Sequence, residues 1–200
     1  MRKAILHLKR SDPVIRDIIQ RVGPYRIQYR DPVFETLVRS IVYQQLSGLA
    51  AGTIYRRLAE KTGEPITPKA ILRLTPEKMR GLGLSRQKTE YIRDLARRTQ
   101  AGELEFDACP DLSDEEIIER FTAVKGVGIW TVQMFLIFAL RRPDVLPTGD
   151  LGVRNAIKRA YGLEEMPKPT DVERYGAAWR PYCSVASWYL WRSLENAPNL

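Results

Sequence analysis

The chain is poor in the residues that build disulfide frameworks and side-chain metal centres. Its 200 residues include two cysteines and one histidine. Cys109 and Cys183 do not have the spacing of a metal motif, and two cysteines are too few for a four-cysteine iron–sulfur cluster. Because His7 is the only histidine, neither a histidine-rich zinc site nor imidazole catalysis is expected.

Long apolar runs and strand patterns are also scarce. The longest clean apolar run, Met134–Leu140, is far shorter than the roughly 20 residues that cross a bilayer. The segment Met1–Arg10 has too few apolar residues for a secretory signal peptide. We therefore expect a soluble cytoplasmic protein without a membrane partner, associated with the nucleoid if the source is prokaryotic. Only Tyr25–Tyr29 has the pattern of an extended segment.

Positive charge is present in excess. The chain has 32 Lys and Arg against 24 Asp and Glu, a formal net charge of +8, which is typical of proteins that bind a polyanion such as nucleic acid. Charge alone does not decide the partner, because many basic proteins do not bind DNA. A hydrophobic content of 44% is enough for a substantial core, in one domain or in two small, closely packed lobes.

Helix start signals recur along the chain. Four capping residues precede a proline, in Asp12-Pro13, Asp31-Pro32, Thr67-Pro68 and Thr75-Pro76. Combined with apolar residues at helical spacing, they predict an all-α chain. We expect helices near residues 12–22, 32–46, 48–61, 68–74, 76–80, 86–100, 114–123, 129–140, 151–160, 171–179 and 182–194.

The most informative segment is Val124–Thr131, which reads VKGVGIWT. Ser113–Glu116 begins a helix before it, with an N-cap and early acidic residues, and a second helix begins at Ile129. Gly126 and Gly128 allow backbone conformations that are closed to other residues, and the unpaired N–H groups at the start of the second helix suit a phosphate. We interpret residues 113–140 as a helix-hairpin-helix motif whose phosphate-binding turn is Lys125, Gly126, Val127 and Gly128.

This hairpin, followed by Pro147-Thr148-Gly149-Asp150, resembles that of the helix-hairpin-helix base-excision DNA glycosylases, and within them the 3-methyladenine DNA glycosylase II (AlkA-type) branch. The resemblance covers nearly the whole chain. Phe34–Ser47 is similar to the family's early helix, Gly81–Ser85 with Lys88 to its middle loop, and Trp179–Tyr182 with Trp188–Trp191 to its closing helix.

The resemblance implies an all-α, two-lobed fold with the active-site cleft between the lobes. Residues 1–200 would form one domain of two closely packed helical lobes, with the hairpin over 113–140. The chain reaches the early helix by Phe34, so it resembles a compact form without the sheet domain that begins the family's best-known members.

The activity that the resemblance implies is a DNA glycosylase of base excision repair. Such an enzyme flips alkylated purines out of damaged double-stranded DNA, hydrolyses the N-glycosidic bond and leaves an abasic site. Asp150 matches the family's catalytic aspartate. An ionised carboxylate there would stabilise the oxocarbenium character of the sugar and orient or deprotonate the attacking water. From the local sequence alone Asp150 is a plain helix N-cap, and the two roles are compatible.

Trp130 indicates the type of reaction. Bifunctional relatives have a lysine in this place that forms a Schiff base with the sugar, so the indole predicts a monofunctional hydrolase without lyase activity. Trp130 and Trp191 also match base-pocket positions of the family, and we add Tyr43 and Met134 to this predicted pocket. Met134 lies four residues after Trp130, on the same helix face, and π-faces attract a positively charged alkylated base.

Two further features are implied by matching positions alone. Gln45 aligns best with the family's DNA wedge, with Leu46 next, where we expect the early helix to end. The backbone carbonyls of Thr122, Val124 and Val127 match a site for an optional monovalent cation, Na⁺ or K⁺. No other cofactor and no iron–sulfur cluster is expected.

Several residues have plainer interpretations. We expect Ser85 to be an ordinary N-cap and Asp144 a surface turn residue. We expect the aromatic residues Trp179, Tyr182 and Trp188 to serve in packing.

Two other interpretations stay open. A helix-hairpin-helix DNA-binding module without chemistry explains the hairpin and the charge equally well, but it does not explain Asp150 and the aromatic face. A glycosylase/lyase for oxidised bases is disfavoured by Trp130. Within the leading interpretation 3-methyladenine, 7-methylguanine, ethenoadenine and deaminated purines all stay open as substrates, and we expect a monomer.

Overall fold

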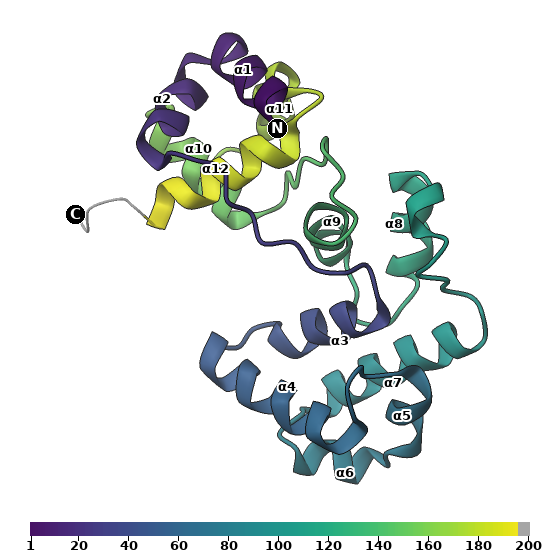
Figure 1. The fold of residues 1–200 in the computed structure, drawn as a ribbon. Helices are drawn as coiled ribbons and strands as arrows, with labels where there is room; N and C mark the ends of the chain where they lie inside the picture. Colours follow the sequence, from purple (N-terminus) through teal and green to yellow (C-terminus); the bar gives the residue numbers. More distant parts are fainter. Residues whose placement is uncertain (196–200) are drawn as a thin grey trace. The chain divides into compact units, whose positions relative to one another are not determined.

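The computed structural model describes residues 1–195, which form helices joined by short connections (Figure 1). The predicted all-α class is confirmed, since residues 1–195 contain no strand. The helices are α1 (Arg2–Ser11), α2 (Pro13–Val22), α3 (Phe34–Tyr43), α4 (Gly48–Thr62), α5 (Pro68–Arg73), α6 (Pro76–Gly81), α7 (Arg86–Gln100), α8 (Asp114–Thr122), α9 (Ile129–Phe138), α10 (Leu151–Ala160), α11 (Pro169–Gly176) and α12 (Cys183–Glu195), with 3₁₀ turns η1 (Cys109–Asp111) and η2 (Ala177–Trp179).

The chain divides into two compact units. The unit that we call the terminal unit combines residues 1–29 with residues 136–195, so that segments far apart in the sequence fold together. The middle unit is Arg30–Phe135. The predicted single domain over residues 1–200 stays a prediction. No helix within residues 1–195 is long and apolar enough to span a membrane.

The core of the terminal unit is formed where α2 packs against α1 and α12, and α10 packs against α12. Two large aromatic side chains, Trp179 and Tyr189, are almost completely buried in it. Trp188 is also buried, so Trp179 and Trp188 have the packing role predicted for them. Tyr182 is half-buried and packs edge-on against His7, with ring centroids 5.4 Å apart.

The sequence analysis predicted no helix before residue 12, and this is wrong, because the structure has helix α1 there. Ala4 and Leu8, one helical turn apart, place its apolar side in the core. The segment has no capping side chain at its start, so it lacks the signal that marks most other helices of the chain. The predicted extended segment Tyr25–Tyr29 forms no strand, and Tyr25 instead packs edge-on against Trp188 at 4.6 Å.

The carboxylate of Asp12 joins α1, α2 and the core around Trp179. Its Oδ1 accepts hydrogen bonds from the backbone N–H groups of Val14 (2.8 Å) and Ile15 (3.1 Å), which caps α2 as predicted. Its Oδ2 accepts from Trp179 Nε1 (2.8 Å) and from the hydroxyl of Tyr161. Four donors therefore meet one buried carboxylate, which stabilises a charge that burial alone would disfavour.

Helix α7 lies at the centre of the middle unit, where it packs against α3, α5 and α6. The predicted caps Thr67, Thr75 and Ser85 accept hydrogen bonds from backbone N–H groups and begin α5, α6 and α7. The prediction for Asp31 is wrong, because α3 begins only at Phe34 and has no side-chain cap. The backbone carbonyl of Asp31 accepts a hydrogen bond from Thr36 Oγ1 at 2.7 Å instead.

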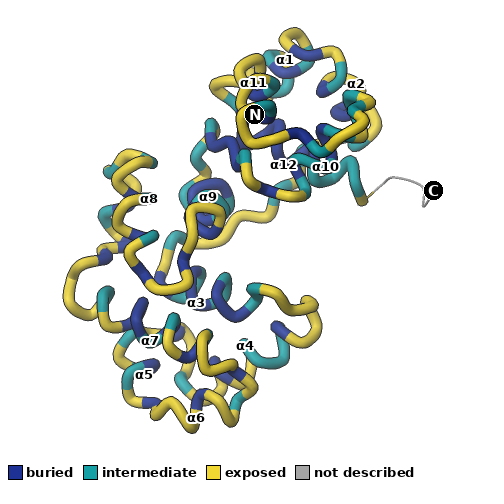
Figure 2. Tube along the Cα trace, turned by 180° about the vertical axis from the view of Figure 1, so that it is seen from behind, coloured by how far each residue is buried: buried dark blue, intermediate teal, exposed yellow. Residues whose placement is uncertain are grey.

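Helix α9 contributes Phe135 to a cluster of buried phenylalanines in the middle unit. Phe121 and Phe135 stack with ring centroids 5.5 Å apart, and Phe106 contacts both edge-on. The α9 sequence, IWTVQMFLIF, has no charged residue, and Figure 2 shows much of this helix as buried. A helix this rich in apolar residues is typical of a protein interior, although its first two residues, Ile129 and Trp130, are exposed.

We expect Asp12→Ala to reduce the free energy of unfolding by about 3 kcal/mol, since it removes a helix cap and leaves the buried Trp179 N–H without its acceptor. Chemical denaturation followed by circular dichroism measures this loss. Asp17→Ala is the matched control, because Asp17 lies on the same helix with an exposed side chain and should change stability by less than about 0.5 kcal/mol. Equal effects of the two substitutions would contradict an anchoring role of Asp12.

Candidate functional site

Asp150 lies in the terminal unit directly before α10, as its N-cap, and is 8% exposed. Its Oδ1 accepts a hydrogen bond from the backbone N–H of Val153 at 2.7 Å, so the predicted N-cap is confirmed. The same oxygen accepts from Trp191 Nε1 at 2.8 Å. The carboxylate is therefore held by its own helix and by an indole that lies 41 residues further along the chain.

Gly152 leaves the space that this pairing needs. A Cβ atom at residue 152 would lie 2.9 Å from Cδ1 of Trp191 and 3.1 Å from Oδ1 of Asp150. Any larger residue would push the indole away from the carboxylate. On its other side Trp191 stacks on Phe138, with centroids 5.7 Å apart and ring planes at 23°. The packing of Trp191 thus fixes the direction from which its N–H reaches Asp150.

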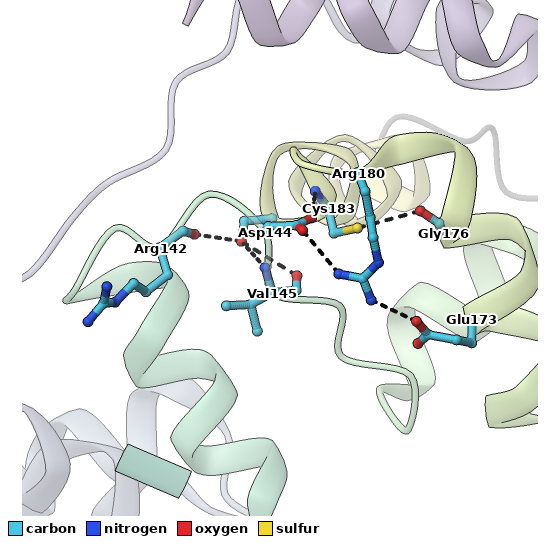
Figure 3. Close-up of polar contacts among 8 residues, drawn as sticks. Arg142, Asp144, Val145, Glu173, Gly176, Arg180 and Cys183 are labelled. Atoms are coloured by element: carbon cyan, nitrogen blue, oxygen red, sulfur yellow. Dashed lines mark hydrogen bonds and ion pairs between the residues drawn. The ribbon is translucent and has the colours of Figure 1, made fainter. Parts of the chain in front are cut away.

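The loop that leads to Asp150 is anchored by Asp144 (Figure 3). Asp144 Oδ1 accepts from the backbone N–H of Cys183 at 3.2 Å, and its Oδ2 accepts from Arg180 Nη1 at 3.0 Å. Arg180 also pairs with Glu173 at 2.7 Å. The prediction of a surface turn residue is therefore incomplete, because Asp144 lies in a turn but ties that turn to the start of α12.

The buried Ser184 side chain binds the backbone of the same loop, at Arg142 and Val145. Its Oγ donates to the carbonyl of Arg142 at 2.7 Å and accepts from the backbone N–H of Val145 at 3.0 Å. The neighbouring thiol of Cys183 donates to the carbonyl of Gly176. Burial, followed by the hydrogen bond with Asp144, raises the pKa of the Cys183 thiol, so this cysteine is a neutral packing residue rather than a nucleophile.

Three of the four predicted base-pocket residues come together in the middle unit. Tyr43, Trp130 and Met134 line one pocket of about 490 Å³, together with Gln44, Gln45, Gly126 and Gly128 among others. Trp130 is 49% exposed, which is unusual for an indole that serves only in packing. The fourth residue, Trp191, lies in the terminal unit beside Asp150.

Arg39 orients Tyr43 at this pocket. Its Nη2 donates to the hydroxyl of Tyr43 at 2.8 Å, and its guanidinium lies 4.4 Å from the centre of the Tyr43 ring. The same guanidinium lies 4.9 Å from the ring centre of Tyr55. One cation–π contact and one hydrogen bond therefore hold the Tyr43 ring in place, and the contact with Tyr55 helps to position the guanidinium.

The predicted wedge residues lie in a turn and not at the end of a helix. Helix α3 ends at Tyr43, earlier than the predicted residue 46, because Gln44 leaves the helical conformation with ψ 130°. Gln45 then adopts φ +55°, a left-handed conformation that costs a non-glycine residue about 1–2 kcal/mol. Gln45 and Leu46 are both exposed in this turn, and Ser47 begins α4 directly after it.

The predicted hairpin is confirmed as a turn between α8 and α9, in which the backbone N–H of Val127 donates to the carbonyl of Val124 at 3.1 Å. Gly126 has φ +76°, and a Cβ atom there would overlap the ring of Tyr91, so the turn requires a glycine at this position. The prediction that Gly128 also needs a backbone conformation closed to other residues is wrong, since its φ is not left-handed and a Cβ atom there would meet nothing within 4 Å.

Asp94, on α7, binds the backbone of the hairpin. Its Oδ2 accepts from the backbone N–H of Lys125 at 3.0 Å, and its carboxylate also pairs with Arg97 and Arg98, each at 3.2 Å. Burial alone would raise the pKa of Asp94, but the hydrogen bonds from Lys125 N–H, Arg97 and Arg98 outweigh burial and lower it. The side chain of Lys125 is left exposed at the tip of the turn.

Comparisons with known proteins identify the family of this chain. Residues 38–181 match the model of a family described as HhH-GPD superfamily base excision DNA repair protein. The chain is 35% identical to DNA-3-methyladenine glycosylase 1 of Schizosaccharomyces pombe, over 98% of this chain and 88% of the relative.

Two solved structures have a TM-score of 0.87 to this chain. One is Schizosaccharomyces pombe 3-methyladenine DNA glycosylase (Mag1) in complex with abasic DNA, 34% identical, covering 98% of each chain. The other is a DNA-3-methyladenine glycosidase of Bacillus halodurans, 35% identical, covering 96% of this chain and 89% of that one.

We expect Gly126→Ala to lower the free energy of unfolding by about 3 kcal/mol, because the left-handed backbone and the Tyr91 ring both oppose a Cβ atom. Gly128→Ala, two residues away in the same turn, should cost less than about 1 kcal/mol. Thermal and chemical denaturation of the two variants measures the difference. The requirement for glycine at residue 126 is disproved if both variants are equally stable.

Proposed function

Because the chain belongs to the HhH-GPD superfamily of base excision DNA repair proteins, we propose that it is a monofunctional DNA glycosylase that removes alkylated purines from double-stranded DNA. It hydrolyses the N-glycosidic bond and leaves an abasic site. The observation that carries the proposal is the buried Asp150 carboxylate, fixed by Val153 and Trp191 at a helix N-terminus. The relatives named DNA-3-methyladenine glycosylase and the structure with abasic DNA support it.

Asp150 acts on the sugar in this proposal. As the base departs, positive charge develops on the sugar ring, and a preorganised carboxylate stabilises that charge. The carboxylate also orients or deprotonates the water that attacks C1′. The two N–H donors on Oδ1 keep the group from rotating, so that little reorganisation is needed when the charge appears.

The aromatic side chains bind the damaged base. Alkylation at N3 or N7 gives a purine a positive charge, which the π-faces of Trp130, Tyr43 and Trp191 attract. Met134 adds a polarisable apolar contact on the face of α9 that it shares with Trp130. The charged base is also a good leaving group, and it therefore needs little help from a general acid.

The hairpin binds the DNA backbone in this proposal. The N–H groups of Gly126 and Gly128 face phosphate, with Lys125 as an additional cation, so that binding is mostly electrostatic and independent of sequence. Val127 belongs to the same phosphate-binding turn and holds its shape, because its N–H donates to the carbonyl of Val124. The carbonyl oxygens of Thr122, Val124 and Val127 are hard ligands of the kind that a monovalent cation takes. Such a cation, Na⁺ or K⁺, would add positive charge toward the phosphate.

Gln45, with Leu46 beside it, fills the gap that the flipped nucleotide leaves in the stack. Both side chains are exposed in their turn, as a wedge requires. The protein acts on DNA as a monomer.

The absence of lyase activity follows from Trp130, which stands where a lysine would form a Schiff base. We expect incubation with methylated duplex DNA to release methylpurines and to leave abasic strands intact until hot alkali cleaves them. Borohydride should trap no covalent DNA adduct. Efficient trapping would contradict the assignment as a monofunctional enzyme.

We expect Asp150→Asn to slow single-turnover base release on the order of a hundredfold or more, because the substitution removes the negative charge but keeps an acceptor for Val153 and Trp191. Circular dichroism should show a normal fold, and affinity for an abasic-site analogue should change much less. A less labile substrate such as ethenoadenine should be tested too, if the enzyme accepts it.

Asp171→Asn is the control for Asp150→Asn, because Asp171 also lies at a helix N-terminus, where it accepts from the backbone N–H of Lys168 at 2.9 Å. This variant should keep the parental rate. Parental rates for Asp150→Asn on every accepted substrate would reduce Asp150 to a helix cap and favour a DNA-binding module without chemistry.

A further inference from the structure

The amino group of Lys88 makes two short hydrogen bonds within the middle unit. Lys88 lies in the first turn of α7 and is half-buried. Its Nζ donates to the carbonyl of Val42 at 2.7 Å and to the carbonyl of Gln44 at 2.6 Å. Burial lowers the pKa of Lys88, so the two carbonyls compensate for part of the water that the ammonium group has lost.

The two carbonyls have different places in the chain. Val42 is in the last turn of α3, where a lysine commonly binds carbonyls that lack a helical partner. Gln44 lies beyond the end of the helix, and its carbonyl belongs to the peptide group that joins it to Gln45. The bond to Gln44 therefore fixes the orientation of the peptide plane that precedes the left-handed Gln45, which is more than helix capping requires.

The side chain of Gln44 ties the same turn to the hairpin. Its Nε2 donates to the carbonyl of Gly126 at 3.0 Å. Further along α7, the ring of Tyr91 packs against Gly126 and Asp94 binds the N–H of Lys125. One helix thus supports both the turn that carries Gln45 and the hairpin.

We propose that Lys88 is a positioning residue for insertion into DNA, and that its ammonium group holds the Gln44–Gln45 peptide so that Gln45 is already ordered when DNA binds. The inference rests on the proposed function, in which Gln45 is the wedge. An unfavourable left-handed residue persists only where its surroundings determine it. Ordering Gln45 in advance lowers the entropy that binding must otherwise overcome.

The test uses the full chain and a DNA duplex in which a tetrahydrofuran abasic-site analogue lies opposite 2-aminopurine. The fluorescence of 2-aminopurine changes when a side chain such as Gln45 inserts into the base stack. We expect Lys88→Met to weaken binding about tenfold and to reduce the fluorescence change. Arg86→Met is the matched control. It also removes one positive charge from the first turn of α7, but the Arg86 side chain is 85% exposed and pairs with Glu90, so binding should weaken less than about twofold.

A double-mutant cycle separates positioning from a general loss of stability. If Lys88 acts through Gln45, Lys88→Met should cost less than about twofold in a Gln45→Ala background. A tenfold loss that persists there would overturn the proposal, as would parental fluorescence in Lys88→Met. Thermal unfolding checks each variant, and Lys88→Leu, which also lacks a donor, takes the place of Lys88→Met under the same criteria if Lys88→Met does not fold.

The readout does not depend on base release, so the two proposals fail separately. A parent protein that changes the 2-aminopurine signal but releases no methylpurine would contradict the glycosylase assignment and leave the role of Lys88 supported. A parent protein that binds the duplex without changing the signal would show that Gln45 does not insert, and this would overturn the role of Lys88.

Discussion

The need to satisfy buried carboxylates with hydrogen-bond donors is the constraint on which much of this structure depends. Within residues 1–195 the buried acidic residues are Asp12, Asp94 and Asp150. Each binds at least one backbone N–H at a helix start or a turn. Asp12 and Asp150 also bind a distant indole of their unit, and Asp94 pairs with two arginines of its own helix. Because an unpaired buried charge is very costly, each carboxylate determines the position of whatever donates to it.

The three carboxylates serve different parts of the molecule. Asp12 binds the indole of Trp179 and so joins α1 and α2 to the core of the terminal unit. Asp94 determines the position of the hairpin through Lys125 N–H. Asp150 is likewise a buried carboxylate that accepts hydrogen bonds from N–H groups, but in the proposed function it also stabilises positive charge on the sugar. Catalysis in this proposal therefore uses a structural device that the fold already contains.

Rigid support is a common feature of the segments proposed to contact DNA. The turn with Gln45 is held by Lys88 and Gln44, and the hairpin is held by Asp94 and by the close contact of Gly126 with Tyr91. Segments that are ordered before binding lose less entropy when they meet a partner. The loop before Asp150 is held in the same manner by Asp144 and Ser184.

Features that depend on neighbours in the sequence were predictable from the chain alone. The caps Ser85, Ser113 and Asp150 each accept a hydrogen bond from a residue three positions further on, and the glycine turn at residue 126 is equally local. Contacts between near neighbours leave short sequence patterns. These patterns predicted the all-α class, most helix starts and the hairpin. The family resemblance supplied the catalytic interpretation of Asp150 and the pocket positions Trp130 and Trp191, to which the sequence analysis added Tyr43 and Met134.

Only the tertiary structure decided the features that depend on distant partners. The early end of α3 and the left-handed Gln45 accompany a lysine that lies 44 residues after Gln44, and the orientation of Asp150 depends on an indole 41 residues away. Asp144 gains its role from Cys183, 39 residues further on, and α1 becomes recognisable through its packing against α2. Local patterns do not contain these contacts, because the chain must fold before the partners meet.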